Sequence, residues 1–185
     1  MRELHAFESV TLDGYFAGPG GDMSWAHAVP PDKEWTDFVS GNAQGGGELL
    51  MGRVTYEMMA SYWPTTQAKQ AMPAVASGMN AMTKHVASRT LKKPEWENTK
   101  LLGGDLLSNV RALKQAPGKG LTILGSGSIV AQLAGAGLID QFQLVVIPVA
   151  IGDGRTLFEG VNANLKLKDS RTFNNGNVVL TYAKA

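Results

Sequence analysis

The sequence predicts an α/β fold built on a mostly parallel sheet, with helices on both faces and a C-terminal antiparallel hairpin. Two observations predict it. Short apolar strands alternate with amphipathic helical segments over residues 3–149, and this alternation is typical of parallel strands joined by helices. Near the C-terminus, Asn174-Asn-Gly-Asn lies between two β-prone runs, and Asn and Gly tolerate the positive φ angles of a tight hairpin turn.

The N-terminal part of the chain predicts a strand, a long loop and a helix. Residues Glu3–Val10 have the β-rich composition of a first strand, and the turn-rich segment Thr11–Gly21 that follows is long enough to cover a ligand. From Trp35 onward, aromatic and aliphatic side chains recur at i, i+3 and i+4, which predicts a helix over Asp32–Ala43.

The middle of the chain repeats the strand-helix alternation. Glu48–Met51 is a short apolar run that ends at Gly52, and a helix is expected to begin after Arg53 and to be stopped by Pro64, because proline removes a helical hydrogen bond. The Met-rich stretch Met72–Met82 is interpreted as adaptable packing. The other elements expected here are strands over Lys84–Ser88 and Lys100–Leu102 and a helix over Asp105–Gln115.

The most informative stretch covers residues 120–133, where a buried strand ends in small residues that open directly into a helix. Gly125 and Gly127 lack a Cβ and so allow a tight turn and close approach by an anion, while Ser126 and Ser128 add hydroxyl donors. The first backbone N–H groups of the helix that begins near Ser128 have no partners within the helix and lie at the positive end of its dipole. The segment therefore predicts a pyrophosphate site, although strand-glycine-helix junctions also occur for packing reasons alone.

This stretch matches neither of the two common nucleotide-binding fingerprints. With Gly125 and Gly127 as the first glycines of a dinucleotide motif, the third position is Val130, and no acidic residue lies near Val145, where a ribose-binding carboxylate is expected. No Gly-Lys-Ser/Thr follows, so the segment is not a P-loop. Other segments must therefore help to hold any nucleotide.

The C-terminal part predicts one buried strand before the hairpin. Residues Ile139–Val149 are β-rich, and their continuous apolar second half is typical of a strand buried on both faces. The two hairpin strands are expected over Leu165–Phe173 and Val178–Ala183.

Composition favours one domain over residues 1–185 that acts on small molecules. Charged residues make up 18% of the chain and the net charge is +1, so neither a nucleic-acid surface nor a polybasic membrane anchor is expected. There is no cysteine, which excludes disulfides, thiolate nucleophiles and cysteine-based zinc sites, and the three histidines lack metal-ligand spacing. Without a secretory signal or an apolar stretch long enough to span a bilayer, we expect a cytoplasmic protein.

Six segments carry a family resemblance when they are taken together and in order. They are Thr11-Leu-Asp-Gly-Tyr-Phe-Ala-Gly, Met51-Gly-Arg-Val-Thr-Tyr-Glu, Ala87-Ser-Arg-Thr, Leu124-Gly-Ser-Gly-Ser, Gly137-Leu-Ile-Asp-Gln-Phe-Gln-Leu and Ile147-Pro-Val-Ala-Ile-Gly-Asp-Gly-Arg-Thr-Leu-Phe. This set resembles the dihydrofolate-reductase-like superfamily, and most closely the reductase domain of bacterial riboflavin biosynthesis. The resemblance implies a three-layer α/β fold and an NADPH-dependent oxidoreductase. It also implies a homodimer, with Pro148–Phe158 near the sheet edge and the dimer surface.

The resemblance further implies that three segments contact one dinucleotide. The implied cofactor residues are Gly52, Arg53 and Thr55 around the phosphates, Ser88, Arg89 and Thr90 on the adenosine 2′-phosphate, and Gly125, Ser126, Gly127, Ser128 and Ile129 on the pyrophosphate. The residue types agree with this assignment, because an arginine fork, hydroxyls and free helix N–H groups all favour phosphate. A clamp for a 2′-phosphate, with no carboxylate for an unphosphorylated ribose, favours NADPH over NADH.

In the family that this chain resembles, the loop after the first strand approaches the nicotinamide and the substrate. The residues implied here are Val10, Leu12, Asp13, Gly14 and Phe16. Asp13 is expected to orient the substrate or to relay a proton, although Asp-Gly is also a common turn pair. The aromatic residues Trp25, Tyr56 and Trp63 either wall the substrate side or are ordinary core residues.

The reaction implied by the resemblance is hydride transfer from NADPH to the ribosyl C1′ of an aminopyrimidine phosphate, through an open-chain imine, to give a ribityl product. Two alternatives stay open, namely reduction of dihydrofolate or another pterin, and an NADPH-binding regulatory module without turnover. Folate-reducing members carry an acidic residue on the first helix, but Asp37 is expected to point away from the apolar stripe and Glu34 lies only near its border. The zinc deaminase signature that accompanies this domain in many bacteria is absent from the sequence.

Overall fold

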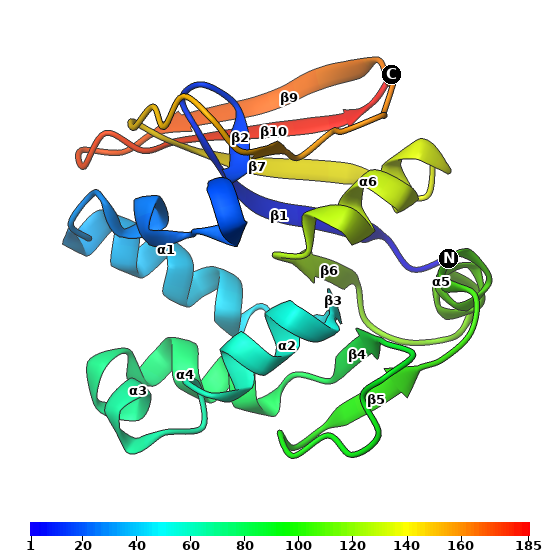
Figure 1. The fold of residues 1–185 in the computed structure, drawn as a ribbon. Helices are drawn as coiled ribbons and strands as arrows, with labels where there is room; N and C mark the ends of the chain where they lie inside the picture. The colour runs from blue at the N-terminus through cyan, green and yellow to red at the C-terminus, as the bar shows by residue number, and fades with distance from the viewer.

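An eight-stranded sheet forms the centre of the molecule, and the computed structural model describes residues 1–185 (Figure 1). In spatial order the strands are β5 (Thr99–Leu102), β4 (Lys84–Ala87), β3 (Glu48–Gly52), β6 (Leu121–Leu124), β1 (Leu4–Thr11), β7 (Gln141–Ile147), β10 (Val178–Lys184) and β9 (Leu165–Thr172). The strands from β5 to β7 pair in parallel, whereas β10 is antiparallel to both β7 and β9. The predicted mostly parallel α/β sheet with a C-terminal antiparallel hairpin is therefore confirmed.

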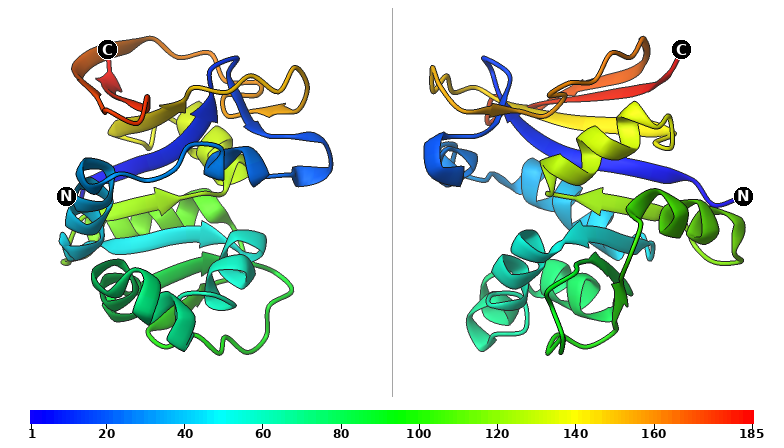
Figure 2. Two further views of the ribbon diagram at one scale, coloured as in Figure 1. Left: turned by 90° about the vertical axis from the view of Figure 1, so that its left-hand side faces the viewer. Right: turned by 45° about the vertical axis from the view of Figure 1, so that its right-hand side comes forward.

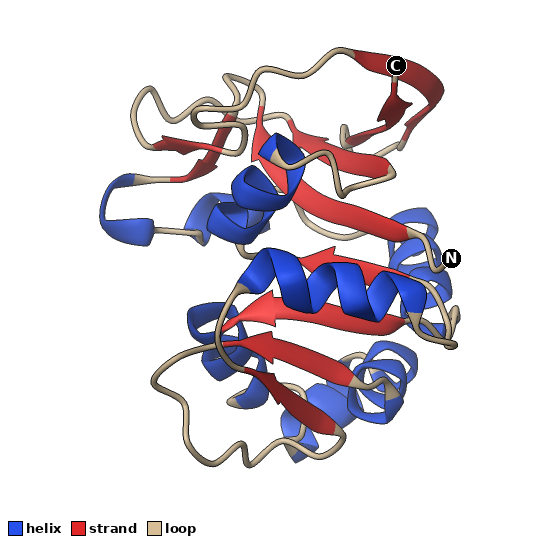
Figure 3. Cartoon of the chain, turned by 90° about the vertical axis from the view of Figure 1, so that its right-hand side faces the viewer, coloured by secondary structure: helices blue, strands red, loops and turns tan.

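Helices lie on both sides of this sheet, as Figures 2 and 3 show. They are α1 (Lys33–Gln44), α2 (Arg53–Ala60), α3 (Thr66–Ala71), α4 (Pro73–Ala81), α5 (Leu106–Gln115) and α6 (Gly127–Gly135). In strand β3, successive side chains pack alternately into the hydrophobic cores on the two faces of the sheet. Leu50 belongs to one core with Val130 of α6, while Leu49 and Met51 belong to a second core with Met79 of α4.

Aspartate side chains start two of the helices that the sequence predicts. The Asp32 carboxylate accepts from the Trp35 backbone N–H at 2.7 Å at the start of α1. Asp105 accepts from the Ser108 N–H at 2.7 Å in the same way at the start of α5. Such N-caps satisfy backbone donors that have no partner within the helix, so the helix starts follow directly from the sequence.

Two short helices between β3 and β4 are absent from the sequence prediction. Helix α3 follows Thr65, whose hydroxyl accepts from the Ala68 N–H at 3.1 Å, and Pro73 occupies the first turn of α4. Val75 and Met79 of α4 are buried in the second core, so the Met-rich stretch does pack, but as a helix. Helix α3 buries only Ala68 and most residues of α4 are small, so neither segment shows a clear hydrophobic period. Helix α2 also ends early, at Ala60.

The segment expected to be a long loop contains ordered structure. Strand β2 (Tyr15–Ala17) lies within it and pairs with β8 (Arg155–Thr156), and 3-10 turns follow at Pro19–Gly21 and Ser24–His27. This pairing joins residues far apart in the sequence through strands of three and two residues, so no local pattern reveals it.

Strand β7 differs from the expected strand that is buried on both faces. Val145 and Ile147 are buried on one face of the strand, whereas on the other face Phe142 is buried and Leu144 and Val146 are only partly buried. No helix of the chain combines the length and apolar character that crossing a membrane requires.

Lys84 is the bulkiest wholly buried side chain, and it joins β4 to the end of α4. Its Nζ donates to the carbonyl oxygens of Met79 at 3.0 Å and Asn80 at 2.9 Å, and it lies 4.3 Å from the centre of the Trp96 ring. The end of a helix and an aromatic face both favour a cation. Removal from water nevertheless lowers the pKa of Lys84 to about 8, and the negative charge of Glu97 opposes this only in part.

We expect the stability of the protein to depend on this lysine above pH 8. As the pH rises, folded Lys84, with its pKa of about 8, releases its proton before an unfolded lysine does, at about 10.4. Its contribution to the free energy of unfolding is therefore lowest below pH 8 and increases by roughly 3 kcal/mol as the pH rises to the unfolded value.

Urea unfolding between pH 7 and pH 10.5 measures this effect. Lys84→Met removes the increase, whereas Lys69→Met, at an exposed position on α3, retains it. An increase of equal size in the wild-type protein and Lys84→Met would contradict the assignment.

Candidate functional site

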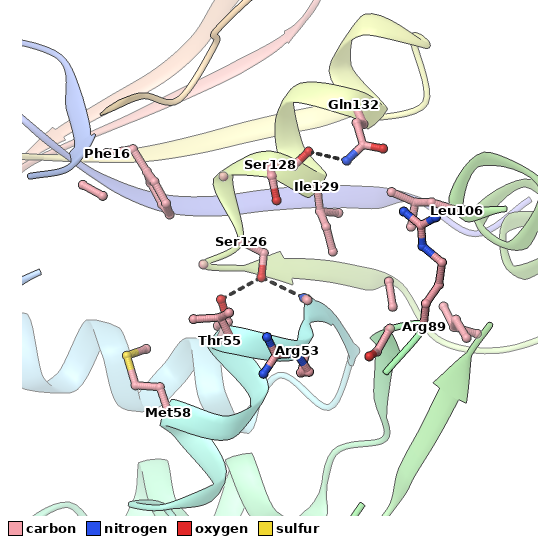
Figure 4. A pocket seen from close by; sticks show the side chains of 18 of the residues that line it. Phe16, Arg53, Thr55, Met58, Arg89, Leu106, Ser126, Ser128, Ile129 and Gln132 are labelled. Atoms are coloured by element: carbon pink, nitrogen blue, oxygen red, sulfur yellow. Dashed lines mark hydrogen bonds between the residues drawn. The ribbon is translucent and has the colours of Figure 1, made fainter. Parts of the chain in front are cut away.

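A cavity of about 800 Å³ lies where the segments that follow β3, β4 and β6 meet (Figure 4). In open α/β sheets, ligands bind at this position, outside the carboxyl ends of parallel strands. The predicted cofactor residues that line the cavity are Gly52, Arg53 and Thr55 after β3, Ser88 and Arg89 after β4, and Gly125, Ser126, Gly127, Ser128 and Ile129 after β6. Of the predicted cofactor residues, only Thr90 does not line it.

The Ser126 hydroxyl connects two of these segments. It accepts from the Gly52 N–H at 2.9 Å and donates to the Thr55 hydroxyl at 2.8 Å, as the dashed lines in Figure 4 show. To make both bonds, Ser126 adopts a left-handed backbone with φ 69° and ψ 52°, which is unfavourable for a residue with a Cβ. The hydroxyl predicted to contact a phosphate therefore binds the protein itself and fixes the spacing between the two junctions.

The two glycines of this loop are required for close contact with neighbouring side chains. A Cβ on Gly125 would lie 2.8 Å from Cγ2 of Thr55, and Gly125 also has a left-handed φ of 62°. A Cβ on Gly127 would lie 2.8 Å from the Phe16 ring. Both distances are too short for a real Cβ contact, so the loop can approach α2 and β2 only with glycine at these positions.

The helices that begin at the two junctions have no side-chain cap. Helix α2 follows Gly52 and α6 follows Ser126, and neither residue accepts a hydrogen bond from its own helix through a side chain. In contrast, α1, α3 and α5 are capped by Asp32, Thr65 and Asp105. Uncapped N–H groups at the positive end of a helix dipole attract an anion.

The charged side chains around the cavity are mostly positive. Arg53, Arg89 and Arg155 line it, and Asp105 is the only acidic residue that does. Arg53 Nη1 pairs with Glu57 at 2.7 Å, whereas Arg89 forms no ion pair. Hydrogen bonds from Ser108 lower the pKa of Asp105, so its carboxylate is ionised and occupied as the cap of α5.

The segment after β4 holds Arg89 at the edge of the cavity. The Ser88 hydroxyl accepts from the backbone N–H groups of Thr90 at 3.1 Å and Leu91 at 2.9 Å, which fixes the turn. In Figure 4 the Arg89 side chain extends toward Leu106 and Gln132. Ser88 and Arg89 therefore face the cavity, while Thr90 contributes to the turn through its backbone.

Asp13 connects two loops beside the cavity and does not line it. Its carboxylate accepts from the Thr11 hydroxyl at 2.6 Å and from the N–H groups of Ile151 at 3.0 Å and Gly152 at 2.8 Å. The bond from Thr11, with those from the backbone, lowers the pKa of Asp13. A carboxylate held ionised by three donors is a weak proton donor, and these bonds tie the loop after β1 to the turn before β8.

The other residues predicted for the substrate side are dispersed. Phe16 lines the cavity, whereas Val10 is buried in the first core, Leu12 is exposed, and Gly14 forms a turn with φ 88°. Although these residues are close in the sequence, their side chains do not share one surface, because successive residues along a chain point in different directions.

The three aromatic residues are packed away from the cavity. Trp25 is buried in a third core with Val145 and Phe173. Tyr56 is buried in the second core, where its hydroxyl accepts from the Trp96 N–H at 3.0 Å, and Trp63 packs against the same core. Their packing supports the alternative that these are ordinary core residues.

Other lining residues were not identified from the sequence. Leu106 has a helical apolar spacing that equally fits a core position, and Leu102 and Leu107 also line the cavity. Met23 and Arg155 reach it through the β2–β8 region, and the pairing of those strands leaves no trace in the local sequence.

Comparison with known proteins gives one family match over most of the chain. The family model described as the RibD C-terminal domain matches residues 2–179. The uncharacterized protein YyaP of Bacillus subtilis (strain 168) is 32% identical to this chain over 177 residues. The match covers 94% of this chain and 90% of YyaP.

Two solved structures have a similar fold. One is a Shewanella sp. PV-4 protein whose name assigns it provisionally to riboflavin biosynthesis; it has a TM-score of 0.75 and 22% identity and covers 99% of both chains. The other is the diaminohydroxyphosphoribosylaminopyrimidine deaminase/5-amino-6-(5-phosphoribosylamino)uracil reductase of Thermotoga maritima. Its TM-score is 0.68 and its identity 14%, over 100% of this chain and 57% of that one. At these identities the likeness concerns the fold.

We expect the Ser126 bridge to contribute measurably to stability. Ser126→Ala removes both hydrogen bonds and leaves the Gly52 N–H without its partner, so the free energy of unfolding falls by about 1–3 kcal/mol. Ser126→Gly loses the same bonds but relieves about 1 kcal/mol of left-handed strain, so it is the more stable variant.

Urea unfolding ranks these variants against Ser61→Ala as a control. The Ser61 hydroxyl is exposed and donates only to the Met58 carbonyl, at 2.7 Å. If Ser126→Ala proved no less stable than Ser61→Ala, the Ser126 hydroxyl would not stabilise the contact between the segments after β3 and β6.

Proposed function

Because the chain belongs to the RibD C-terminal domain family, we propose that it is an NADPH-dependent reductase that transfers a hydride to a small heterocyclic or imine substrate. The family has a dihydrofolate-reductase-like fold and consists of reductases that are typically NADPH-dependent. The observation that carries the proposal is the cavity at which two uncapped helix N-termini and an unpaired arginine meet.

The cavity lining fits a phosphorylated dinucleotide. The first turns of α2 and α6 offer backbone donors for a diphosphate, and Ser88 and Arg89 offer a hydroxyl and a guanidinium for a 2′-phosphate. Three arginines and one aspartate favour a ligand with several negative charges. The single carboxylate, Asp105, is already engaged as a helix cap, which disfavours a role in binding an unphosphorylated ribose.

When bound, NADPH supplies the hydride. The residues of the chain then have to orient the substrate and keep water from the reacting atoms. Phe16, Met23 and Ile129 give part of the cavity an apolar wall for this purpose. Asp13 contributes indirectly. It holds the turn that leads into β8 through its bonds to Ile151 and Gly152, and so positions Arg155.

No side chain that lines the cavity is suited to donate the proton that must accompany the hydride. An arginine guanidinium does not give up a proton in proteins, and the pKa of Asp105, the one acid in the lining, is lowered. Asp13 does not line the cavity and its pKa is also lowered. We therefore expect the proton to come from water.

We further propose that the substrate resembles 5-amino-6-(5-phosphoribosylamino)uracil. Hydride addition to C1′ of its open-chain imine, with a proton taken up by the imine nitrogen, gives the ribitylamino product. Two observations support this choice. One is the activity named for the Thermotoga maritima protein, and the other is that Arg155, which pairs with Ala17 next to Phe16, lines the cavity and offers a guanidinium to a substrate phosphate.

The two alternatives have different support. Folate reduction is disfavoured, because Glu34 bonds to Arg171 at 3.0 Å and Asp37 bonds to Lys33 at 2.6 Å, and neither acid lines the cavity. A non-catalytic NADPH-binding regulatory module is favoured by one observation, the absence of a suitable acid among the lining residues.

The homodimer implied by the family resemblance stays a prediction. Apolar side chains on one side of the C-terminal strands are incompletely covered, with Leu144, Val146 and Leu180 partly buried and Leu167 exposed. Sedimentation equilibrium distinguishes a dimer from a monomer.

We expect the purified protein to bind NADPH more tightly than NADH. Arg89→Ala removes the charge assigned to the 2′-phosphate, so its affinity for NADPH falls by roughly tenfold to a hundredfold while its affinity for NADH changes little. Fluorescence titration of both coenzymes measures this, with Arg111→Ala, an exposed arginine outside the cavity, as the control. Equal wild-type affinities for NADPH and NADH would refute the phosphate assignment.

The substrate is tested by following NADPH absorbance with the ribosylaminopyrimidine phosphate and with dihydrofolate in parallel. We expect oxidation with the first compound only, because the lining is positive and the acids of α1 are paired elsewhere. Turnover of dihydrofolate alone would favour the pterin alternative, and binding of NADPH without oxidation by either would favour the regulatory module.

A further inference from the structure

Glu8 is a buried acid to which the proposed function assigns no role. It lies on β1 and is 2% exposed. Its side chain lies on the same face of the strand as Leu4, Ala6 and Val10, which belong to the core beneath α6. A carboxyl group in such surroundings is costly unless it is neutral or well paired.

The strand register places Glu8 next to the loop that forms the predicted phosphate site. In the parallel pair of β1 and β6, Phe7 lies opposite Leu124, so Glu8 and Gly125 are the next residues of the two chains. The Gly125 backbone lies close enough to the Glu8 carboxyl to lower its pKa, while Oε1 of Glu8 is buried and has no hydrogen-bond partner. Gly125 and Ser126 are consecutive left-handed residues, and such a turn persists only where its surroundings hold it.

The elements around Glu8 offer no charge that would stabilise its ionised form. β6, β7 and α6 contain no ionisable side chain, Tyr15 is the only one on β2, and His5 lies on the opposite face of β1. The charged residues that line the cavity itself are Arg53, Arg89, Asp105 and Arg155. Burial raises the pKa of Glu8 well above its usual value, and the Gly125 N–H opposes this only in part.

We propose that Glu8 is a positioning residue for the dinucleotide, which in its neutral form holds the Gly125–Ser126 turn so that the N-terminus of α6 is presented to a phosphate. This inference rests on the proposed NADPH site. A neutral carboxyl supplies an acceptor oxygen for the Gly125 N–H without placing a negative charge beside the bound anion. Ionised Glu8 keeps the acceptor but repels the diphosphate through a medium of low dielectric constant.

Proton and coenzyme therefore bind cooperatively. Because the anionic coenzyme favours the neutral acid, bound NADPH raises the pKa of Glu8 further. The affinity for NADPH then falls as the pH rises through the pKa that Glu8 has in the free protein.

The test compares the dissociation constant of NADPH for the wild-type protein, Glu8→Gln and Glu8→Leu by fluorescence titration between pH 6.5 and pH 9.5. Wild-type affinity falls by about tenfold toward high pH. Glu8→Gln keeps a neutral acceptor and binds tightly throughout, whereas Glu8→Leu lacks the acceptor and binds about fivefold more weakly at every pH. The same series with NADH excludes titration of the 2′-phosphate as the cause.

A second measurement needs no variant. Calorimetric titration of the wild-type protein with NADH, in buffers of different ionisation enthalpy, counts the protons taken up on binding, and we expect uptake that increases toward high pH.

The outcomes separate this inference from the proposed function. Identical pH profiles for the wild-type protein and Glu8→Gln, or binding without proton uptake, would overturn the role of Glu8 and leave the NADPH site intact. Failure of the wild-type protein to bind either coenzyme at any pH would overturn the proposed function, and the inference with it.

Discussion

The hydroxyl of Ser126 is the contact on which the cavity depends. Strands β3 and β6 pair up to Leu50 and Ile123, so the helices that follow them, α2 and α6, begin side by side. Beyond the paired residues, Ser126 links the two junctions by accepting from the Gly52 N–H and donating to Thr55. Because its side chain bridges the junctions instead of capping α6, the first N–H groups of both helices remain free for an anion.

The two buried ionisable groups Lys84 and Glu8 differ in how well their polar atoms are hydrogen-bonded. Lys84 has two carbonyl partners and an aromatic face, and it joins α4 to the sheet away from the cavity. Glu8 has one oxygen without a partner and lies beneath the loop between β6 and α6. A side chain that serves packing alone gains nothing from an unsatisfied carboxyl, so the position of Glu8 is better explained by the loop that it supports.

The sheet and the junctions followed from the sequence because their signals are local. Apolar runs marked the strands, Asp32 and Asp105 marked helix starts, and the small residues at 125–128 marked a loop that lines the cavity. Non-local features did not follow. The β2–β8 pairing brings Arg155 to the cavity, and the bonds from Ile151 and Gly152 occupy Asp13, but both depend on residues more than a hundred positions apart. Thr90 does not line the cavity, and its backbone N–H takes part in the turn after β4, a local feature that composition does not encode.

We propose that two neighbouring helix N-termini and the turn after β4 together bind one phosphorylated dinucleotide. A crystal structure of the protein with NADPH tests it most directly. We expect density for the diphosphate between the first turns of α2 and α6, with the 2′-phosphate against Ser88 and Arg89. A coenzyme bound elsewhere, or a cavity closed by the side chains of its own walls at saturating NADPH, would contradict it.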